Sequence, residues 1–244
     1  ILYAIGVLLF WRILSTLFDA PIRILLGSLF FALHPTHIES VVWLASRKDV
    51  LSLVWVMATV LALLKRRSIW LIAVLSLLAY WSKNTAISLA PILFVASFVI
   101  RKDNPQKIRW WLQWLPIAAV FGFGLMLTFK VGDMMHMFAP SRAETALDTL
   151  TITAQVWTQY AQMLIWPSEL SLFYVEPEVQ PLSNIRVLFG LTLILSCILT
   201  PILTHRRFPG VAFGVAWIGF SLLPVSQISP IQNLMADRYL LLPA

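Results

Sequence analysis

The run IRVLFGLTLILSCILTPILT, residues 185–204, decides the fold class of this 244-residue chain. It carries a single charge, that of Arg186. A helix of this length rises about 30 Å, the thickness of the hydrocarbon layer of a bilayer. Further apolar runs lie on its N-terminal and C-terminal sides, so the sequence predicts an all-α fold, a polytopic transmembrane helical bundle with about eight spanning helices. The predicted spans are residues 1–18, 21–33, 50–64, 69–82, 85–100, 110–129, 185–204 and 210–224.

The composition agrees with a membrane protein. Hydrophobic residues make up 59% of the chain and charged residues 12%, and the mean hydropathy is +0.83. Soluble globular domains and disordered segments do not have this composition. The net charge of +7 would favour nucleic acid in a soluble protein, but here we expect it to orient the chain in a bilayer, with no nucleic-acid partner. The single cysteine, Cys197, excludes an internal disulfide and a CxxC metal site.

Basic clusters predict which side of the membrane each loop occupies. Lys65–Arg67, the basic residues from Arg101 to Arg109, and His205–Arg207 fall on one side if each run crosses once. That side is the cytoplasm, because cytoplasmic loops carry an excess of lysine and arginine. Residues 151–166 are nearly long enough to cross, but a crossing there would place residues 205–207 outside.

Residues 151–166 are therefore predicted to form an external interfacial helix. Ile152, Val156, Tyr160 and Leu164 are four residues apart and share one helical face, as expected of a helix that lies on a membrane surface. Residues 1–244 are expected to form one membrane-embedded domain. We expect this domain to be incomplete at both ends, because the chain begins without methionine and stops as an apolar stretch begins.

The densest polar cluster is HPTHIE, residues 34–39, followed by SRKD, residues 46–49. Pro35 suits the first position of a helix and His34 the cap before it. On one continuous helix, Glu39, Arg47 and Asp49 would share a pocket while Lys48 pointed to lipid headgroups. The alternatives are a solvated helix entry with a weak surface ion pair and a metal site of His34, His37 and Glu39. The helix cap is the commoner cause of such a string, so no metal site is predicted.

Two more polar clusters are predicted on the same external side. Lys83 follows one short apolar run and precedes another, so we expect a recessed cation suited to a phosphate; the alternative is a snorkelling lysine. Arg238 offers a planar fork for a phosphate and Tyr239 an interfacial hydroxyl; the alternative is an interfacial anchor. Although almost 200 residues of sequence separate the three clusters, they are predicted to form a single polar site that faces outward.

The strings LHPTHIESVVW, residues 33–43, and RKDVLS, residues 47–52, resemble the hallmark of bacterial polytopic membrane proteins with C-terminal tetratricopeptide repeats. These proteins are similar to the transmembrane and tetratricopeptide-repeat O-mannosyltransferases of animals, in the GT-C glycosyltransferase superfamily. The resemblance extends over almost the whole chain. Weaker agreement follows at Ser82-Lys83 with Pro91, at Tyr160 to Trp166-Pro167, at residues 170–174, at residues 223–225, at residues 236–239 and at Leu242-Pro243.

The resemblance implies a GT-C-like fold and an enzyme that moves a sugar, such as mannose, from a polyprenyl-phosphate carrier to an acceptor hydroxyl. The acceptor would be a protein serine or threonine, or a glycan, on the extracytoplasmic face of a bacterial plasma membrane. Membrane lipid, the lipid-linked donor and the acceptor are then the partners, and whether a divalent metal takes part stays open. The alternatives are a non-catalytic membrane platform for a repeat domain and, ranked last, a lipid-carrier flippase.

The resemblance also implies roles for individual residues. The main catalytic base belongs to the first external loop, which is expected to lie outside this chain, so Glu39 and Asp49 are secondary catalytic candidates. The residues expected to bind the carrier phosphate are Arg238, Lys83, Arg47, His37 and Tyr239. His34 and Asp237 are expected to line the same cavity.

Overall fold

The computed structural model describes residues 1–101, 114–134, 145–168, 170–175, 177–226, 233 and 235–244. These residues form an all-α structure with ten α-helices, five short 3₁₀ helices and no strands, so the all-α part of the predicted fold is confirmed. The α-helices are α1 (Leu2–Leu17), α2 (Pro21–Leu33), α3 (Ile38–Val42), α4 (Arg47–Leu64), α5 (Ile69–Ser82), α6 (Leu89–Arg101), α8 (Leu115–Met134), α9 (Ala146–Ile165), α10 (Ile185–Thr204) and α11 (Pro209–Leu222). The 3₁₀ helices are η1 (Pro35–His37), η2 (Leu44–Ser46), η3 (Asn84–Ser88), η4 (Leu223–Val225) and η5 (Asp237–Leu240).

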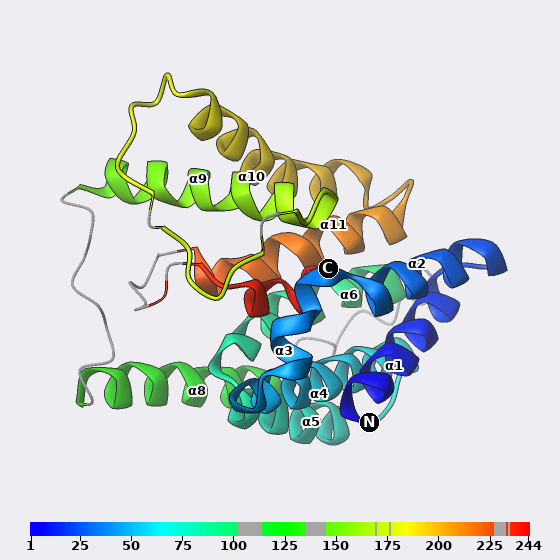
Figure 1. Ribbon diagram of the computed structural model, residues 1–244. Coiled ribbons are helices and arrows are strands. Elements are labelled where there is room, and N and C mark those ends of the chain that lie inside the picture. The colour runs from blue at the N-terminus through cyan, green and yellow to red at the C-terminus, as the bar shows by residue number, and fades with distance from the viewer. Residues whose placement is uncertain (102–113, 135–144, 169, 176, 227–232, 234) are drawn as a thin grey trace.

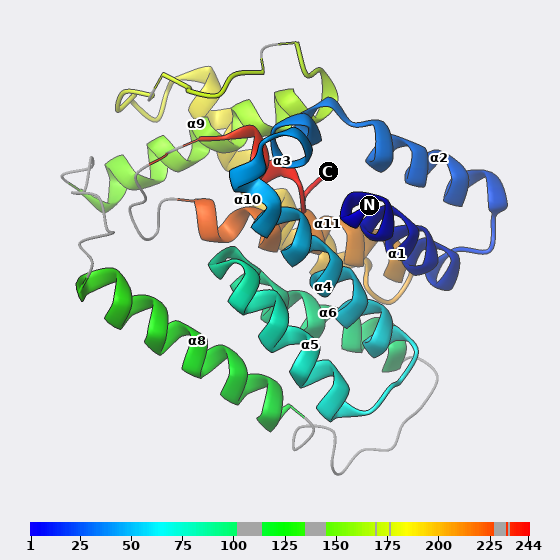
Figure 2. The ribbon, with the colours of Figure 1, turned by 60° about the horizontal axis from the view of Figure 1, so that its bottom comes forward.

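Most of the long helices pack side by side around one apolar core. α4 contacts α1 on one side and α5 on the other, and α5 contacts α8 (Figure 2). α6 and α11 pack behind α4, and α10 lies on the outer side of α11 (Figure 1). Leu53 and Met57 of α4 and Leu93 of α6 are fully buried in this core, which gives α4 its central position.

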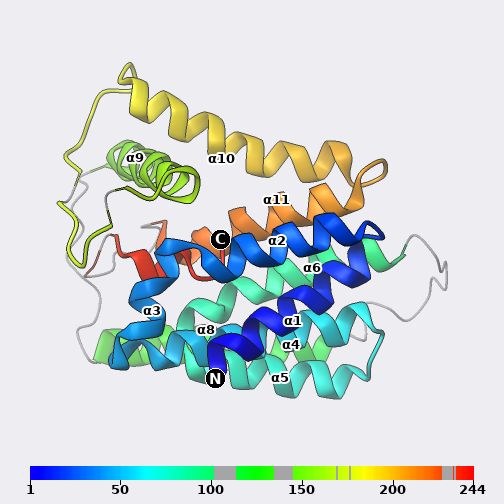
Figure 3. The same cartoon turned by 45° about the vertical axis from the view of Figure 1, so that its right-hand side comes forward.

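Helix α9 lies across the bundle. In Figure 3 it is seen nearly end-on while α10, α11 and α4 run across the picture. The predicted face of Ile152, Val156, Tyr160 and Leu164 packs into a second apolar cluster with the segments around η4 and η5. The predicted helix and its apolar face are present, but this face contacts protein, where the sequence predicted the membrane surface.

The prediction of eight spanning helices is wrong in number. Among the described residues one helix, Ile185–Thr204, is by itself long and apolar enough to cross a bilayer. Pro21–Leu33 and Pro35–Val42 would make a second span if this pair, bent by 44°, crosses as one. Five other apolar helices, of 10–17 residues, are shorter than a span needs: Leu2–Leu17, Ile69–Ser82, Asn84–Ser97, Pro116–Lys130 and Pro209–Val225.

Several features explain why few helices could span. The runs 21–33 and 69–82 form α2 and α5 over their full length, so these helices are short because the apolar runs are short. The 3₁₀ helices η3 and η4 occupy one end of the runs 85–100 and 210–224. Helix α4 has 18 residues, but its first turn, Arg47-Lys48-Asp49, is charged and its apolar part begins at Val50. The predicted run 110–129 becomes α8, which begins at Leu115, and residues 110–113 lie outside the described residues.

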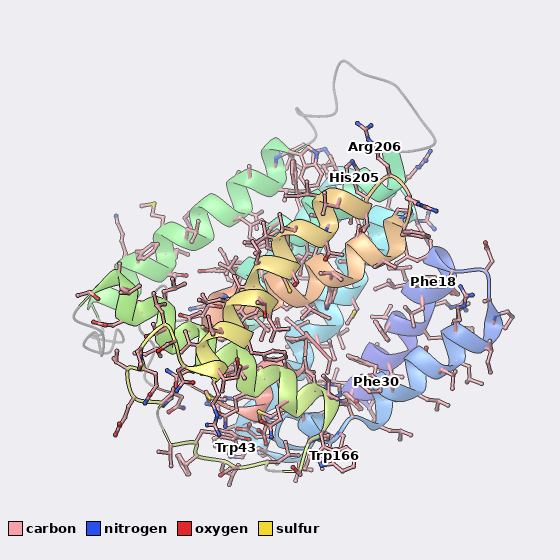
Figure 4. All side chains as sticks on the ribbon, turned by 90° about the horizontal axis from the view of Figure 1, so that it is seen from above. Phe18, Phe30, Trp43, Trp166, His205 and Arg206 are labelled. Atoms are coloured by element: carbon pink, nitrogen blue, oxygen red, sulfur yellow. The ribbon has the colours of Figure 1, made fainter. Side chains whose placement is uncertain are left out.

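The molecule has two distinct ends. Figure 4 shows Trp43 and Trp166 at one end, and His205 with Arg206 at the opposite end. Trp43, which lies in sequence between the two parts of the first polar cluster, is thus at the opposite end of the bundle from His205 and Arg206.

Candidate functional site

The first polar cluster begins with the helix cap that the sequence predicts. His34 Nδ1 accepts a hydrogen bond from the backbone N–H of Thr36, with Pro35 at the first position of η1. Since Nδ1 accepts, Nε2 carries the proton and donates to the carbonyl of Leu164 at 3.1 Å. His34 therefore ties the end of α9 to the start of η1.

Glu39 of α3 holds the third cluster in place. Its carboxylate accepts two hydrogen bonds from Arg238, one from the backbone N–H at 2.8 Å and one from the guanidinium at 2.7 Å. The Glu39 side chain is 3% exposed and the Arg238 side chain 16%. Two charges so far removed from water are stable only as a pair, so Glu39 fixes both the backbone and the side chain of Arg238.

Asp49 and Lys83 form a second ion pair. Lys83 Nζ lies 3.0 Å from Asp49 Oδ1, and the two side chains are 15% and 2% exposed. Lys83 is recessed, as the short runs around it predict. Burial lowers the pKa of Lys83, and Asp49 offsets this effect only in part while Arg238 and Lys48 add to it.

Aromatic rings join the two ion pairs. The Tyr239 ring lies 5.4 Å from Lys83 Nζ and 5.4 Å from the Arg238 guanidinium carbon. The Arg238 guanidinium also lies 5.3 Å from the Trp43 ring. Cations over ring faces at these distances gain electrostatic stabilisation. Residues from all three predicted clusters therefore meet in one site, and the predicted convergence is confirmed.

The site surrounds a cavity of about 610 Å³, which we call the polar cavity. The cations Lys48, Lys83 and Arg238 line it together with a single carboxylate, Asp49, so its walls favour an anion. Its lining residues are Trp43, Ala45, Ser46, Lys48, Asp49, Trp81, Ser82, Lys83, Asn84, Thr85, Pro224, Val225, Asn233, Arg238 and Tyr239.

A void of about 20 Å³ extends the polar cavity inward. Asp49, Lys83 and Arg238 line both spaces, and Ser221 and Ser52 line the void. Asp49 Oδ2 and Ser221 Oγ accept or donate no hydrogen bond among the described residues. The void has the volume that one water molecule needs, and these two groups are the polar partners it would use.

Three successive residues at η5 are each held by a different part of the chain. The backbone N–H of Ala236 donates to the Tyr160 hydroxyl of α9 at 3.4 Å. Asp237 accepts a hydrogen bond from the hydroxyl of Tyr174, and Arg238 is held by Glu39. A single 3₁₀ turn has little stability of its own, so these contacts place Arg238.

The structure corrects the predicted roles of Arg47 and Lys48. The helix breaks at Trp43, whose ψ of 117° is extended, so Glu39 and Arg47 are not on one continuous helix. Arg47 is exposed and its Nε donates to the carbonyl of Leu44, away from the polar cavity. Lys48, predicted to face lipid headgroups, lines the cavity instead.

His37, His34 and Asp237 do not line the polar cavity as predicted. His37 is buried, with its Nδ1 2.7 Å from the Tyr3 hydroxyl and its ring against Phe31. His34 borders a separate apolar cavity between α2 and the end of α9.

Burial and the nearby Glu39 raise the pKa of Asp237, while the Tyr174 hydrogen bond lowers it. No group of three or more histidine, cysteine or acidic side chains among the described residues could hold a metal ion.

Sequence reasoning missed Lys48, Trp43 and Tyr174 as parts of the site. Trp43 and Lys48 could be assigned to the polar cavity only with knowledge of the helix break after α3. No proline or glycine in the sequence indicates this break. Tyr174 lies in a stretch with no helical or strand periodicity. The sequence signal for it was the polar-aromatic string at 171–174, which the resemblance already included.

Replacing Asp49 with asparagine is expected to lower the pKa of Lys83 further. The folded-state pKa of Lys83 already lies below its ordinary value, and the negative charge of Asp49 is what opposes that shift. As the pH rises, the Lys83 ammonium of the variant should lose its proton at a lower pH than in the wild type. Any anion binding that depends on the ammonium should be lost at that lower pH as well. NMR titration of ¹³C-methylated lysines, with the Lys83 signal assigned by Lys83→Arg, measures the shift. Exposed Lys65 is the internal control, and an unchanged Lys83 titration would contradict the ion pair.

No protein-family model, no curated protein and no solved structure matches the chain.

Proposed function

We propose that the chain is the membrane part of a glycosyltransferase that takes a sugar from a polyprenyl-phosphate carrier and transfers it to an acceptor hydroxyl. The single observation that carries the proposal is the polar cavity, in which Lys83, Arg238 and Lys48 converge beside one carboxylate. The resemblance of residues 33–43 and 47–52 to GT-C enzymes supplies the reaction class. A protein serine or threonine, or a glycan, is the proposed acceptor.

The charges in the cavity suit a lipid-linked sugar phosphate. Glu39 and Asp49 neutralise Arg238 and Lys83 in part, and Lys48 adds one more positive charge at the cavity wall. When the bond between the sugar and the carrier phosphate breaks, the carrier leaves as a phosphate monoester with additional negative charge. Cations that are already fixed in place stabilise this charge without having to move. Arg238 presents its remaining N–H groups for this purpose. The Tyr239 ring lies beside both the Arg238 guanidinium and Lys83 Nζ and holds the two cations at the cavity.

The two carboxylates have different proposed roles. Glu39 is committed to Arg238 and does not line the polar cavity, so it acts as a positioning residue. Asp49 lines the cavity and keeps one oxygen without a described partner, so it is the carboxylate of this chain that can assist in accepting the hydroxyl proton. The main base is proposed to come from a part of the protein outside this chain.

The proposed location is a bacterial plasma membrane, with the polar cavity on the extracytoplasmic side. Helix α10 supports this location, since large apolar side chains such as Leu195, Ile198 and Ile202 are exposed along its outer face. Exposed Trp81 and Trp166 suit the level of the lipid headgroups. The basic cluster 205–207, at the far end of the bundle, would then face the cytoplasm.

The test is sugar transfer by the full-length protein in membrane vesicles. Replacing Arg238 alone would leave Glu39 buried and unpaired, so the informative variants are Glu39→Gln with Arg238→Met and Asp49→Asn with Lys83→Met. Each pair removes a cation without leaving a buried charge. We expect transfer from a polyprenyl-phosphate sugar to fall at least a hundredfold in both, as when a charge-stabilising donor is removed from an active site.

Arg47→Ala is the matched control, because it removes one positive charge next to Lys48 from a side chain that points away from the cavity. We expect it to keep wild-type transfer. Full transfer by both double variants would rule out the polar cavity as the donor site. A wild-type protein that transfers no sugar but retains its repeat-domain partners would favour the platform alternative.

A further inference from the structure

Tyr174 stands out because it links the long loop after α9 to the residue next to Arg238. Its hydroxyl donates a hydrogen bond to Asp237 Oδ1 and accepts one from the backbone N–H of Ser171 at 2.9 Å. The neighbouring side chains of Phe173 and Val175 are 85% and 93% exposed and point away from the bundle. Between residues 172 and 175, Tyr174 is therefore the side chain that fastens the loop to η5.

The environment of Asp237 makes this hydrogen bond consequential. Asp237 is buried, and Glu39 lies near enough to raise its pKa by charge repulsion. The groups that act on Asp237 are Tyr174 and the backbone N–H of Ser171 from the loop, Glu39 from α3 and Tyr160 from α9. Arg238 is already paired with Glu39, so the Tyr174 hydroxyl is the side-chain donor that the structure gives to Asp237.

We propose that Tyr174 is a positioning residue of the polar cavity: by donating to Asp237 it holds η5 so that the Arg238 guanidinium faces the cavity. Without this donor the buried Asp237 carboxylate beside Glu39 would keep only the backbone N–H of Ser171, and η5 would relax to bring Asp237 to water. Because Arg238 follows Asp237 directly, its guanidinium and its backbone N–H would leave Glu39 and the cavity wall. The inference rests on the proposed role of Arg238 in binding the donor phosphate.

Two measurements on the full-length protein test the proposal. The first is hydrogen exchange of the peptide that covers residues 235–242, followed by mass spectrometry without ligand. The second is binding of a polyprenyl phosphate to the protein in nanodiscs. For Tyr174→Phe we expect faster exchange of this peptide and about tenfold weaker binding, which corresponds to about 1.4 kcal/mol.

The double variant Tyr174→Phe with Asp237→Asn distinguishes positioning from loop packing. Asparagine carries no charge, so its burial without the tyrosine hydroxyl costs less, and both exchange and binding should return toward wild type. Asp237→Asn alone should resemble wild type, because the amide oxygen still accepts from Tyr174. Phe173→Ala, next to Tyr174 but exposed, should change neither measurement.

The pH dependence has a definite sign. The Tyr174 hydrogen bond lowers the pKa of Asp237, so its loss raises that pKa further above the ordinary value. The defect of Tyr174→Phe therefore exists above the raised pKa, where Asp237 is charged, and disappears as the pH falls through it. A defect caused by lost loop packing would not change with pH in this way.

Unchanged exchange of residues 235–242 in Tyr174→Phe, or a defect that Asp237→Asn does not rescue, would overturn the positioning role. The proposed function fails in a different way. If the wild type binds no polyprenyl phosphate while the exchange results are as expected, the donor assignment is wrong and Tyr174 still holds η5.

Discussion

Glu39→Ala is expected to destabilise the protein by about 3–5 kcal/mol, the cost of breaking a buried ion pair by removing one partner. The Arg238 guanidinium would keep its charge in a site where it is 16% exposed, and its backbone N–H would lose an acceptor. The free energy of unfolding by denaturant in detergent micelles measures the effect. Anion binding should be lost as well, since η5 is no longer held by α3.

Two comparisons isolate the ion pair from the rest of Glu39. Glu39→Gln keeps an oxygen that can accept from the Arg238 backbone, so it should cost less than Glu39→Ala. Adding Arg238→Met to Glu39→Gln should recover much of the loss, because no buried charge is left unpaired. Asp19→Ala removes an exposed carboxylate and should have little effect on unfolding. A Glu39→Ala protein as stable as wild type would contradict the buried pair.

Gly190→Ala is expected to separate α10 from α9. A Cβ atom at this position would lie 1.9 Å from the carbonyl oxygen of Ala154, and a backbone atom cannot turn aside as a side chain can. The same contact includes a hydrogen bond of 2.7 Å from Thr158 Oγ1 to the carbonyl of Arg186. Overpacking of this kind costs about 1–3 kcal/mol. Thermal unfolding of the purified protein measures the loss.

Gly214→Ala is the matched control, because Gly214 also lies in a helix but has no atom within 4 Å of the added Cβ. Alanine favours a helix over glycine by about 1 kcal/mol, so this variant should be as stable as wild type or more stable. A Gly190→Ala protein that behaves like Gly214→Ala would show that α9 and α10 are not in close contact. Since α9 carries Tyr160, a displaced α9 should also weaken the hydrogen bond from the Ala236 backbone N–H to the Tyr160 hydroxyl.

Local features of the site were predictable where they depend on a few neighbouring residues. The cap of His34 before Pro35 follows from their positions in sequence, and the recessed place of Lys83 follows from the two short runs around it. The face of Ile152, Val156 and Tyr160 follows from their spacing of four residues. The meeting of the three polar clusters followed from charge placement, since it requires only that they lie at the same end of the bundle.

The pairing of charges was not predictable. Glu39 was expected beside Arg47, but one extended residue, Trp43, rotates everything after it, so Arg47 turns outward and Lys48 turns in. Arg238, 199 residues away, takes the place beside Glu39. Pairing across such a separation depends on how α3 and η5 pack, and no local pattern in the sequence encodes that packing.

The sequence by itself determined that this is an all-α chain of apolar helices with its three polar clusters at one end, because the period and composition of each run act locally. Only the tertiary structure decided how long each helix is, that α9 packs its apolar face on protein, and which cation belongs to which carboxylate. The physical reason is that burial of a charge is stable only with a partner at close range, and that range is set by the packing of helices far apart in the chain.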